Sequence, residues 1–234
     1  MGIMDRFTVN VTAKKIRKRN VRLRFWSTVA LICTTILLMF YAFVHLANSL
    51  GNFTVRINER NDAGIAICES RDFDKPTQYL VSDPVRNMDN ITESWLPEGL
   101  DDVDGTHNGK NYIAYTFYLK NVGTLSVDYQ ADIKILDVKK QADEAIRVKV
   151  YKNGVPTLYA KPQKGTLEPE PYTTPFYSID KVSSDVYENF QIGEIDKYTI
   201  VVWLEGNDPE CIDDIIGGRV KLAMHFQIVG GEDE

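Results

Sequence analysis

Histidine and cysteine are scarce in this sequence, and the short motifs that usually carry catalysis are missing. The 234 residues include three histidines and three cysteines. No His-Glu-x-x-His pair is present to place two metal ligands on one helical face. The chain also lacks a Gly-x-Ser-x-Gly elbow, a phosphate-binding Gly-rich loop and a Cys-x-x-Cys motif. A site built from distant residues is not excluded, but we predict that the protein is not an enzyme.

A second absence is charge, because no Asp, Glu, Lys or Arg occurs from Phe25 to Leu50. A helix needs roughly 20 apolar residues to cross the hydrocarbon core of a bilayer, and this segment is long enough. An aromatic residue near its boundary suits the headgroup region. We therefore predict a membrane span over residues 25–50 that begins at Phe25 and Trp26 and ends at Leu50.

Basic residues are concentrated before this span. Residues 1–24 hold eight of the 27 basic residues but one of the 33 acidic residues, so the net charge of −6 divides into +7 there and −13 in the remainder. A basic segment can indicate nucleic-acid binding, but one that adjoins an apolar segment indicates membrane lipid, and we expect no nucleic-acid partner. The positive-inside rule predicts a single-pass protein of the cell membrane, with residues 1–24 in the cytoplasm and the C-terminal part outside.

A removable signal sequence is the alternative to a retained helix. The apolar region of a signal peptide has about 7–15 residues and precedes a cleavage site of small residues. The segment here is longer, and its best candidate site, Ala47-Asn48-Ser49, matches that pattern poorly. We expect the helix to be retained, and cleavage stays the alternative.

Apolar and polar residues alternate through much of the remaining chain with the period of two that is typical of β-strands. Asn153-Gly154 lies between two such runs and is a strong hairpin signal. Residues 198–204 are apolar almost throughout, which predicts a strand covered on both faces. The predicted strands are residues 53–57, 65–68, 113–119, 127–135, 146–150, 157–160, 198–204 and 219–228.

These strands, about seven or eight in number and without βαβ spacing, predict an all-β fold, an antiparallel β-sandwich or jelly roll preceded by one transmembrane helix. Only residues 182–190 and 213–216 are expected to form short helical turns. The predicted parts are a basic cytoplasmic tail at 1–24, the helix at 25–50, an extracytoplasmic β-sandwich at 51–229 and an acidic tail at 230–234.

Two acidic segments could hold a metal ion. One is Asp101-Asp102-Val103-Asp104-Gly105, and the other runs from Glu205 to Asp214 after the most apolar strand. Calcium prefers six to eight oxygen ligands on a sharply turning backbone. The spacing departs from the EF-hand pattern, and solvated turns would look the same. We expect no cofactor other than calcium, for which the candidate ligands are Asp101, Asp102, Asp104, Asp208 and Asp213, with Glu210 and Asp214 beside the last two.

The three cysteines occupy different parts of the chain. Cys33 falls in the apolar segment, and Cys68 and Cys211 lie near the two ends of the outer domain. In an oxidising compartment the last two could pair and close a long loop. The alternative is two buried free thiols. We predict a Cys68–Cys211 disulfide.

Two phrases carry a resemblance to a known family. They are F-Y-L-x-N-x-G, from Phe117 to Gly123, and W-L-E-G-x-D-P, from Trp203 to Pro209. With the order of the strands, they make residues 51–228 resemble the TasA/camelysin family of surface proteins of Gram-positive bacteria. The resemblance implies an exported jelly-roll sandwich with roles in biofilm fibres and at the cell surface.

Fibres in that family form by strand donation, a case of edge-strand addition. The resemblance therefore implies that Phe53, Val55 and Ile57 belong to a donated strand. The long basic tail and the missing processing site depart from the family pattern and argue against free polymerisation. Some members have been described as metalloproteases, but this chain has no zinc motif, so that activity is not carried over.

The sequence therefore predicts a membrane-anchored structural or assembly protein of the cell surface or extracellular matrix, acting through protein partners or self-association. One alternative is a surface-displayed ligand- or calcium-binding module. Another is an accessory subunit of a membrane complex that makes contacts through its helix. Small polar residues on one helical face would favour the accessory subunit, and the residues of this kind are Ser27, Thr28, Thr34 and Thr35.

Overall fold

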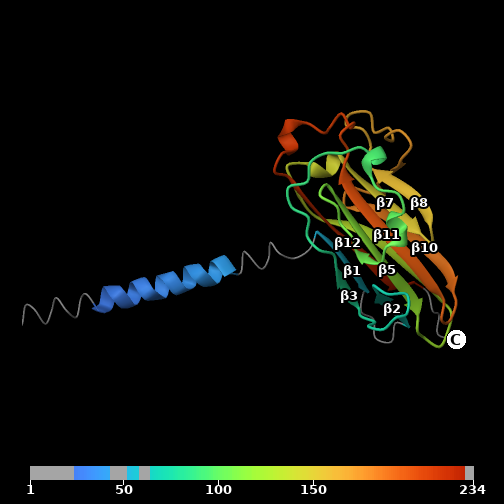
Figure 1. Cartoon of the computed structure of the whole chain (residues 1–234), viewed down its shortest axis with the longest axis horizontal. Helices are drawn as coiled ribbons and strands as arrows, with labels where there is room; N and C mark the ends of the chain where they lie inside the picture. The colour runs from blue at the N-terminus through green and yellow to red at the C-terminus, as the bar shows by residue number, and fades with distance from the viewer. Residues whose placement is uncertain (1–23, 43–51, 58–63, 230–234) are drawn as a thin grey trace, which may run out of the picture. The chain divides into compact units, whose positions relative to one another are not determined.

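The computed structural model describes residues 24–42, 52–57 and 64–229. The chain divides into two units, Met1–Leu50 and Gly51–Glu234. Most of the predicted basic tail, the acidic tail at 230–234 and the predicted end of the span at Leu50 lie outside the described residues. The first unit contributes one described helix, and the second contributes a β-rich domain (Figure 1).

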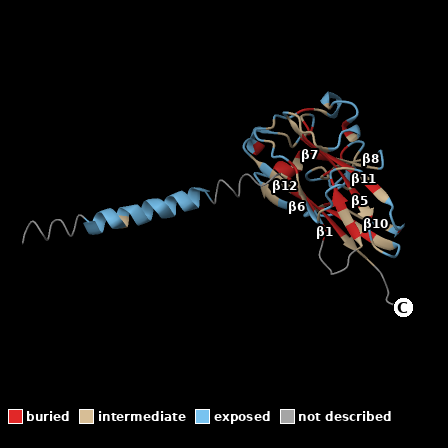
Figure 2. Ribbon diagram, turned by 60° about the horizontal axis from the view of Figure 1, so that its bottom comes forward, coloured by how far each residue is buried: buried red, intermediate tan, exposed pale blue. Residues whose placement is uncertain are grey.

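The helix runs from Arg24 to Ala42 and is long and apolar enough to cross a membrane. Nearly all of its side chains are exposed, including Phe25 and Trp26 (Figure 2). Its hydroxyl groups are satisfied within the helix, because each donates a hydrogen bond to a backbone carbonyl three or four residues earlier. Internal satisfaction of this kind is what a polar residue needs in lipid. The hydroxyls so bonded are those of Ser27, Thr28, Thr34 and Thr35.

The β-rich domain is built from two mixed sheets that face one another. The first sheet, sheet A, has the strand order β10-β6-β12-β1-β3, and the second, sheet B, has the order β2-β5-β11-β7-β8-β9, with β4 paired to β5. The strands are β1 (Phe53–Ile57), β2 (Ile65–Cys68), β3 (Tyr79–Val81), β4 (Gly105–Thr106), β5 (Tyr112–Asn121), β6 (Val127–Lys139), β7 (Ile146–Lys152), β8 (Val155–Ala160), β9 (Thr174–Pro175), β10 (Lys181–Phe190), β11 (Ile195–Leu204) and β12 (Arg219–Ile228).

The direction of strand pairing differs from the prediction at two places. Most neighbours are antiparallel as expected, but β1 pairs with β12 in parallel, with Phe53 opposite Leu222 and Ile57 opposite Phe226. The short β9 is also parallel to β8. Alternation of polar and apolar residues reports which face of a strand is buried but carries no information about the direction of its neighbour. The purely antiparallel sandwich is therefore corrected to a mixed one.

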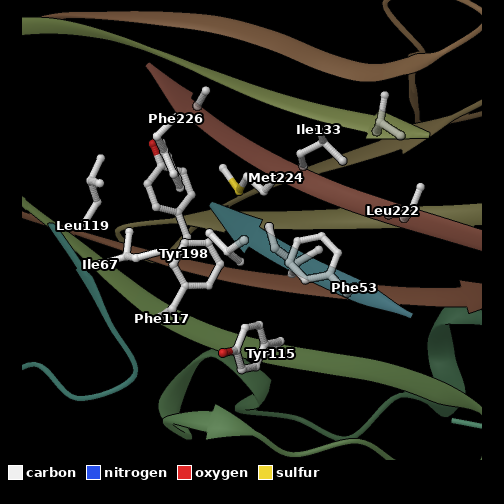
Figure 3. Packing of buried hydrophobic residues seen from close by; sticks show 14 of the residues in the cluster. Phe53, Ile67, Tyr115, Phe117, Leu119, Ile133, Tyr198, Leu222, Met224 and Phe226 are labelled. Atoms are coloured by element: carbon white, nitrogen blue, oxygen red, sulfur yellow. The ribbon is translucent and has the colours of Figure 1, made fainter. Parts of the chain in front are cut away.

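Aromatic and aliphatic side chains fill the space between the two sheets (Figure 3). Phe117 of β5 stacks on Tyr198 of β11 with ring centroids 5.8 Å apart, and Phe226 of β12 meets both rings from the opposite sheet. On the other side of this group Phe53 of β1 contacts Tyr115 of β5 edge to face. Edge-to-face and stacked rings at these distances are favourable arrangements, so the core joins the two sheets through β5, β11, β12 and β1.

Sheet B is covered on its outer face as well. The segment that includes the one-turn helices η1 (Glu93–Trp95) and η2 (Leu100–Asp102) contributes Ile91 and Leu100 to a second apolar cluster with Ala114, Val201 and Trp203. The central strands β5 and β11 are thereby buried on both faces. The prediction that residues 198–204 form a doubly covered strand is confirmed.

Of three local predictions about turns, two are confirmed and one is wrong. Asn153 and Gly154 form the expected two-residue hairpin turn between β7 and β8, and both have the positive φ that such a turn requires. Residues 213–215 form the expected helical turn, η4. Residues 182–190, however, form strand β10. Their apolar residues recur every four positions, which resembles a helical period, and irregularities in the pairing of β10 with β6 break the strand alternation.

Asn121 closes the end of β5 from a fully buried position. Its amide nitrogen donates to the carbonyls of Leu125 and Phe190 at 2.9 and 2.8 Å, and its amide oxygen accepts from the backbone of Gly123 at 2.9 Å. Gly123 lies so close to Gly64 that an added Cβ would be 2.9 Å from the Gly64 Cα. One side chain therefore fixes the crossing from sheet B to sheet A.

Replacing Asn121 with alanine should destabilise the domain by about 1–3 kcal/mol, because it removes three hydrogen bonds of a buried side chain, among them the buried bond to the Phe190 carbonyl. Thermal unfolding of the full chain in detergent micelles, followed by near-ultraviolet circular dichroism, measures this change. The neighbouring exposed residue is the control, and Val122→Ala should alter stability by no more than about 0.5 kcal/mol. Equal stability of the two variants would contradict the role of Asn121.

Candidate functional site

The first predicted acidic segment does not converge on one point. Asp101 and Asp102 belong to η2, and Asp102 and Asp104 are exposed. Asp104 accepts a hydrogen bond from the hydroxyl of Tyr118 at 2.5 Å, and this bond, after burial, raises the pKa of Tyr118 to about 12. Among the described residues, the carboxylates of this segment are not part of any group of three that could share an ion.

The second acidic segment forms an ordered loop at the end of β11, at the upper end of the domain in Figure 1. The indole nitrogen of Trp203 donates to Glu205 at 3.0 Å, and the other oxygen of Glu205 accepts from the backbone of Asn207 at 3.1 Å. The backbone of Ile91 pairs with both sides of this turn through Leu204 and Gly206. These contacts set the direction in which the chain enters the next acidic residues.

Asp208 is the first of these residues, and its side chain is fully buried. It accepts a hydrogen bond from a guanidinium nitrogen of Arg147 at 2.6 Å through one oxygen and from the backbone of Glu210 at 2.8 Å through the other. Arg147 is the second residue of β7 and is itself only 5% exposed. A buried arginine of this kind needs carboxylate partners, because an unpaired buried charge is costly.

The second partner of Arg147 is Glu170, from the long loop between β8 and β9. One oxygen of Glu170 lies 3.4 Å from the guanidinium, and its other oxygen, Oε1, is buried without a hydrogen-bond partner. Oxygens of Glu170, Asp208 and Glu210 all lie within 4.8 Å of one another. We call these three residues the acidic cluster.

The sequence located only part of the acidic cluster. Asp208 and Glu210 were recognised as neighbours in one segment, but Asp213 and Asp214 lie on η4, exposed and outside the cluster. Glu170 comes from a segment 38 residues before Asp208 in the chain. The repeated Glu-Pro at residues 168–171 is a weak local signal, and nothing in it distinguishes the buried Glu170 from the exposed Glu168.

Crowding of carboxylates changes the protonation of the acidic cluster. Burial and the adjacent charge of Asp208 raise the pKa of Glu170, although Arg147 opposes this shift. A hydrogen bond with Asp208, together with burial, raises the pKa of Glu210. Two carboxylates that share a site cannot both ionise without cost. The cluster therefore favours binding a positive species, either a proton or a cation.

A pocket of about 300 Å³ lies at the other end of β11. Its wall includes Lys152, whose ammonium group lies 4.1 Å from the ring centroid of Tyr187 and 3.0 Å from a carboxylate oxygen of Asp196. Asp196 also accepts a hydrogen bond from Tyr129, and burial raises the pKa of the Tyr129 hydroxyl. Because the charges of Lys152 and Asp196 already neutralise each other, the acidic cluster is the stronger candidate site.

The predicted disulfide is not formed, because both cysteines are free thiols. Cys68 lies opposite Tyr118 of β5, whereas Trp203, at the end of β11 that leads to Cys211, lies opposite Tyr112. Six residues of strand separate these two positions, a distance of roughly 20 Å at 3.3 Å per residue. Disulfides require Cα atoms within about 7 Å. Cys68 and Cys211 lie near the two ends of the domain in the sequence, but they lie at opposite ends of sheet B in space.

The residues predicted for strand donation form β1 in the chain's own sheet. Phe53 and Val55 are fully buried and Ile57 nearly so, between β12 and β3. The described strand therefore fills its own sheet, and donation stays a prediction.

Comparisons with known proteins add little to this geometry. No family model matches the chain, and no curated protein matches it. One solved structure, a β-glucosidase from Kluyveromyces marxianus in complex with glucose, is 11% identical and has a TM-score of 0.25. The match covers 76% of this chain but 17% of that enzyme. A likeness at this level carries no argument about fold or function, and the TasA/camelysin resemblance stays a prediction.

Replacing Glu170 with glutamine should remove one contribution to the pH dependence of stability. A carboxyl group whose pKa is raised by folding binds a proton that the unfolded chain has lost, so the free energy of unfolding falls as pH rises from about 4.5 through the raised pKa. The variant lacks this contribution. The difference in unfolding free energy between the parent and Glu170→Gln should therefore decrease with rising pH, as measured by urea denaturation.

The difference in unfolding free energy between the two proteins is measured, instead of the pH dependence of either one, because His225 changes stability with pH in the opposite direction to Glu170. Burial, and after it the nearby Arg56, lowers the pKa of His225 to about 4, which makes stability rise with pH in the range where Glu170 makes it fall. His225 is the same in both proteins and cancels in the difference. A difference that stays constant with pH would contradict the shifted pKa of Glu170.

Proposed function

We propose that this chain is a membrane-anchored structural protein of the cell surface or extracellular matrix, with a retained N-terminal anchor and its β-domain on the outer side. The apolar, outward-facing side chains of the helix from Arg24 to Ala42 support the anchor. The basic residues before Phe25 support a cytoplasmic N-terminus. The proposal involves no catalytic step. Because the helix hydroxyls already bond to their own backbone, an accessory subunit that makes contacts through them is less favoured.

The position of β1 is the observation that carries an assembly role. This first strand of the domain lies between β12, the last strand, and β3, and it contributes the fully buried Phe53 and Val55. The β1 strand of a second copy would fit the same place between β12 and β3, with the same hydrogen-bond ladders and the same buried side chains. Exchange of an identical element between copies requires little change in contact energy. We infer that copies of this protein associate by exchanging β1.

The open edge of sheet A offers a second route that the side chains favour less. Strand β10 pairs with β6 alone among the described strands, and an unpaired edge can accept an added strand. This edge carries the charged Lys181, Asp185 and Glu188 and has irregular pairing near both ends. Charges and bulges are features that protect edges from strand addition, so exchange of β1 is the preferred route.

We propose further that the two sheets form the jelly roll of the TasA/camelysin family. Support comes from the structural roles of the two phrases that carry the resemblance. Asn121, in the first phrase, holds the turn after β5 through three hydrogen bonds. Glu205 and Asp208, in the second, hold the loop after β11. A role in biofilm fibres rests on this resemblance.

The proposed orientation can be tested with single cysteines in a background where the three native cysteines are replaced. Tyr172→Cys should react with a membrane-impermeant maleimide on intact cells, because Tyr172 is fully exposed in the outer domain. Thr12→Cys, in the basic segment, should react only after lysis. Labelling of Thr12→Cys but not Tyr172→Cys on intact cells would reverse the topology, and recovery of Tyr172→Cys only in the medium would show a cleaved signal sequence.

Strand exchange can be tested by cross-linking β1 to β12. Thr54 and Ala223 are paired across these strands, and adjacent strand positions are close enough for a disulfide. In the same cysteine-free background, oxidised Thr54→Cys/Ala223→Cys in membranes should run as covalent dimers or larger species on a non-reducing gel, because exchanged strands place the two cysteines of a bond on different chains.

The matched control is a pair whose strands should not exchange. Lys134→Cys/Ala223→Cys joins β6 to β12, which are paired within one chain, and it should remain monomeric when oxidised. If the Thr54→Cys/Ala223→Cys protein also forms its disulfide entirely within monomers, β1 stays in its own sheet and the exchange proposal is wrong.

A further inference from the structure

One carboxylate oxygen in the acidic cluster has no visible partner although it is inside the protein. The side chain of Glu170 is 6% exposed, and its Oε1 atom accepts no hydrogen bond from any of the described residues. A buried polar atom without a partner costs roughly 1–3 kcal/mol, and more when the group is charged. Native proteins rarely leave such an atom unsatisfied. The position of Glu170 Oε1 beside two other carboxylates therefore indicates a missing positive partner.

The charges near the acidic cluster do not balance. Within the described part of the chain, three carboxylates face a single guanidinium, that of Arg147, which contacts one oxygen of Asp208 and one oxygen of Glu170. The two lysines in the loop between β8 and β9 are engaged elsewhere. Lys161 binds Asp143 and Glu144, and the ammonium of Lys164 binds Gln141. When all three carboxylates are ionised, two negative charges remain, which is the charge that one divalent cation neutralises.

The donor atoms define the kind of cation. All three ligands are carboxylates, and oxygen ligands are preferred by hard cations such as calcium. The group includes no histidine nitrogen or cysteine sulfur, as a zinc site usually would. The oxygens lie within 4.8 Å of one another, which fits inside a coordination shell with bonds of about 2.4 Å.

The acidic cluster is accessible from one side. Asp208 and Glu170 are buried, whereas Glu210 is partly exposed, as is Cys211 next to it. The Glu210 side chain lies against the loop that holds Glu170, because one of its oxygens accepts from the backbone of Lys164 at 3.3 Å, and an oxygen of Glu210 lies within 4.8 Å of one of Asp208. A cation could therefore enter past Glu210 and reach the two buried carboxylates, with water completing its shell.

We propose that Glu170, Asp208 and Glu210 bind one divalent cation of the calcium type. The ion joins the loop between β8 and β9 to the loop after β11, which are linked to each other at this site through Arg147. Arg147 is a positioning residue, since it orients the oxygens that face away from it. This inference does not depend on anchoring or on strand exchange, so either proposal can fail alone.

Calcium titration of the full chain in detergent micelles, after removal of metal with EDTA, tests the proposal directly. Isothermal titration with calcium chloride should show one site per chain, with a dissociation constant on the order of 10⁻⁴ M, as for extracellular calcium modules. Glu170→Gln and Glu210→Gln should each weaken calcium binding at least tenfold, because each replaces a charged ligand with a neutral side chain of nearly the same shape.

Two exposed carboxylates serve as matched controls. Glu168 lies in the same loop as Glu170, and Asp214 lies just after Glu210; both are exposed and outside the acidic cluster. Glu168→Gln and Asp214→Asn should bind calcium within twofold of the parent protein. Equal weakening in the controls would indicate a diffuse charge effect and overturn the proposal.

A stability measurement separates loss of a ligand from loss of folding. Calcium should raise the unfolding temperature of the parent protein, because a ligand that binds the folded state stabilises it. Metal-free Glu170→Gln should unfold at a temperature no lower than the metal-free parent, since it removes a buried charge, yet calcium should not raise it. The absence of saturable calcium binding by the parent, or a parent-like calcium response in Glu170→Gln, would overturn the proposal.

Discussion

The structure depends on contacts between aromatic rings across the two sheets. Phe117 and Tyr198 stack within sheet B, and Phe226 reaches them from sheet A. Their burial, worth several kcal/mol for each ring, fixes β5, β11 and β12 relative to one another. Three of the features described above adjoin these strands. The turn held by Asn121 follows β5, the acidic loop follows β11, and β1 lies alongside β12.

Much of this arrangement could be predicted from the sequence, because the core is built from strands with a clear period. Residues 53–57 and 65–68 were predicted as strands and form β1 and β2 with those bounds. Asn153-Gly154 was enough to predict a hairpin, since few other residues accept the backbone angles of such a turn. In contrast, β10 was missed because irregular pairing interrupts its alternation.

The acidic cluster could be predicted only in part, for a physical reason. Asp208 and Glu210 are two residues apart, so any turn keeps them close. Glu170 and Arg147 reach them from other elements, and their meeting depends on how the long loop after β8 folds back over sheet B. The disulfide prediction failed for the same reason. Nearness to the ends of a domain in sequence says nothing about which end of a sheet each cysteine occupies.

The parallel pairing of β1 with β12 also determines how the domain responds to mechanical load. The chain enters the domain through β1, so a pull from the N-terminal side along the axis of this strand draws it lengthwise past β12 and β3. The hydrogen bonds of both ladders run across the strands, and such a pull strains them together instead of one after another. A pull along the axis of β1 is therefore opposed by both ladders at once, so mechanical load on the N-terminal side is shared between β12 and β3.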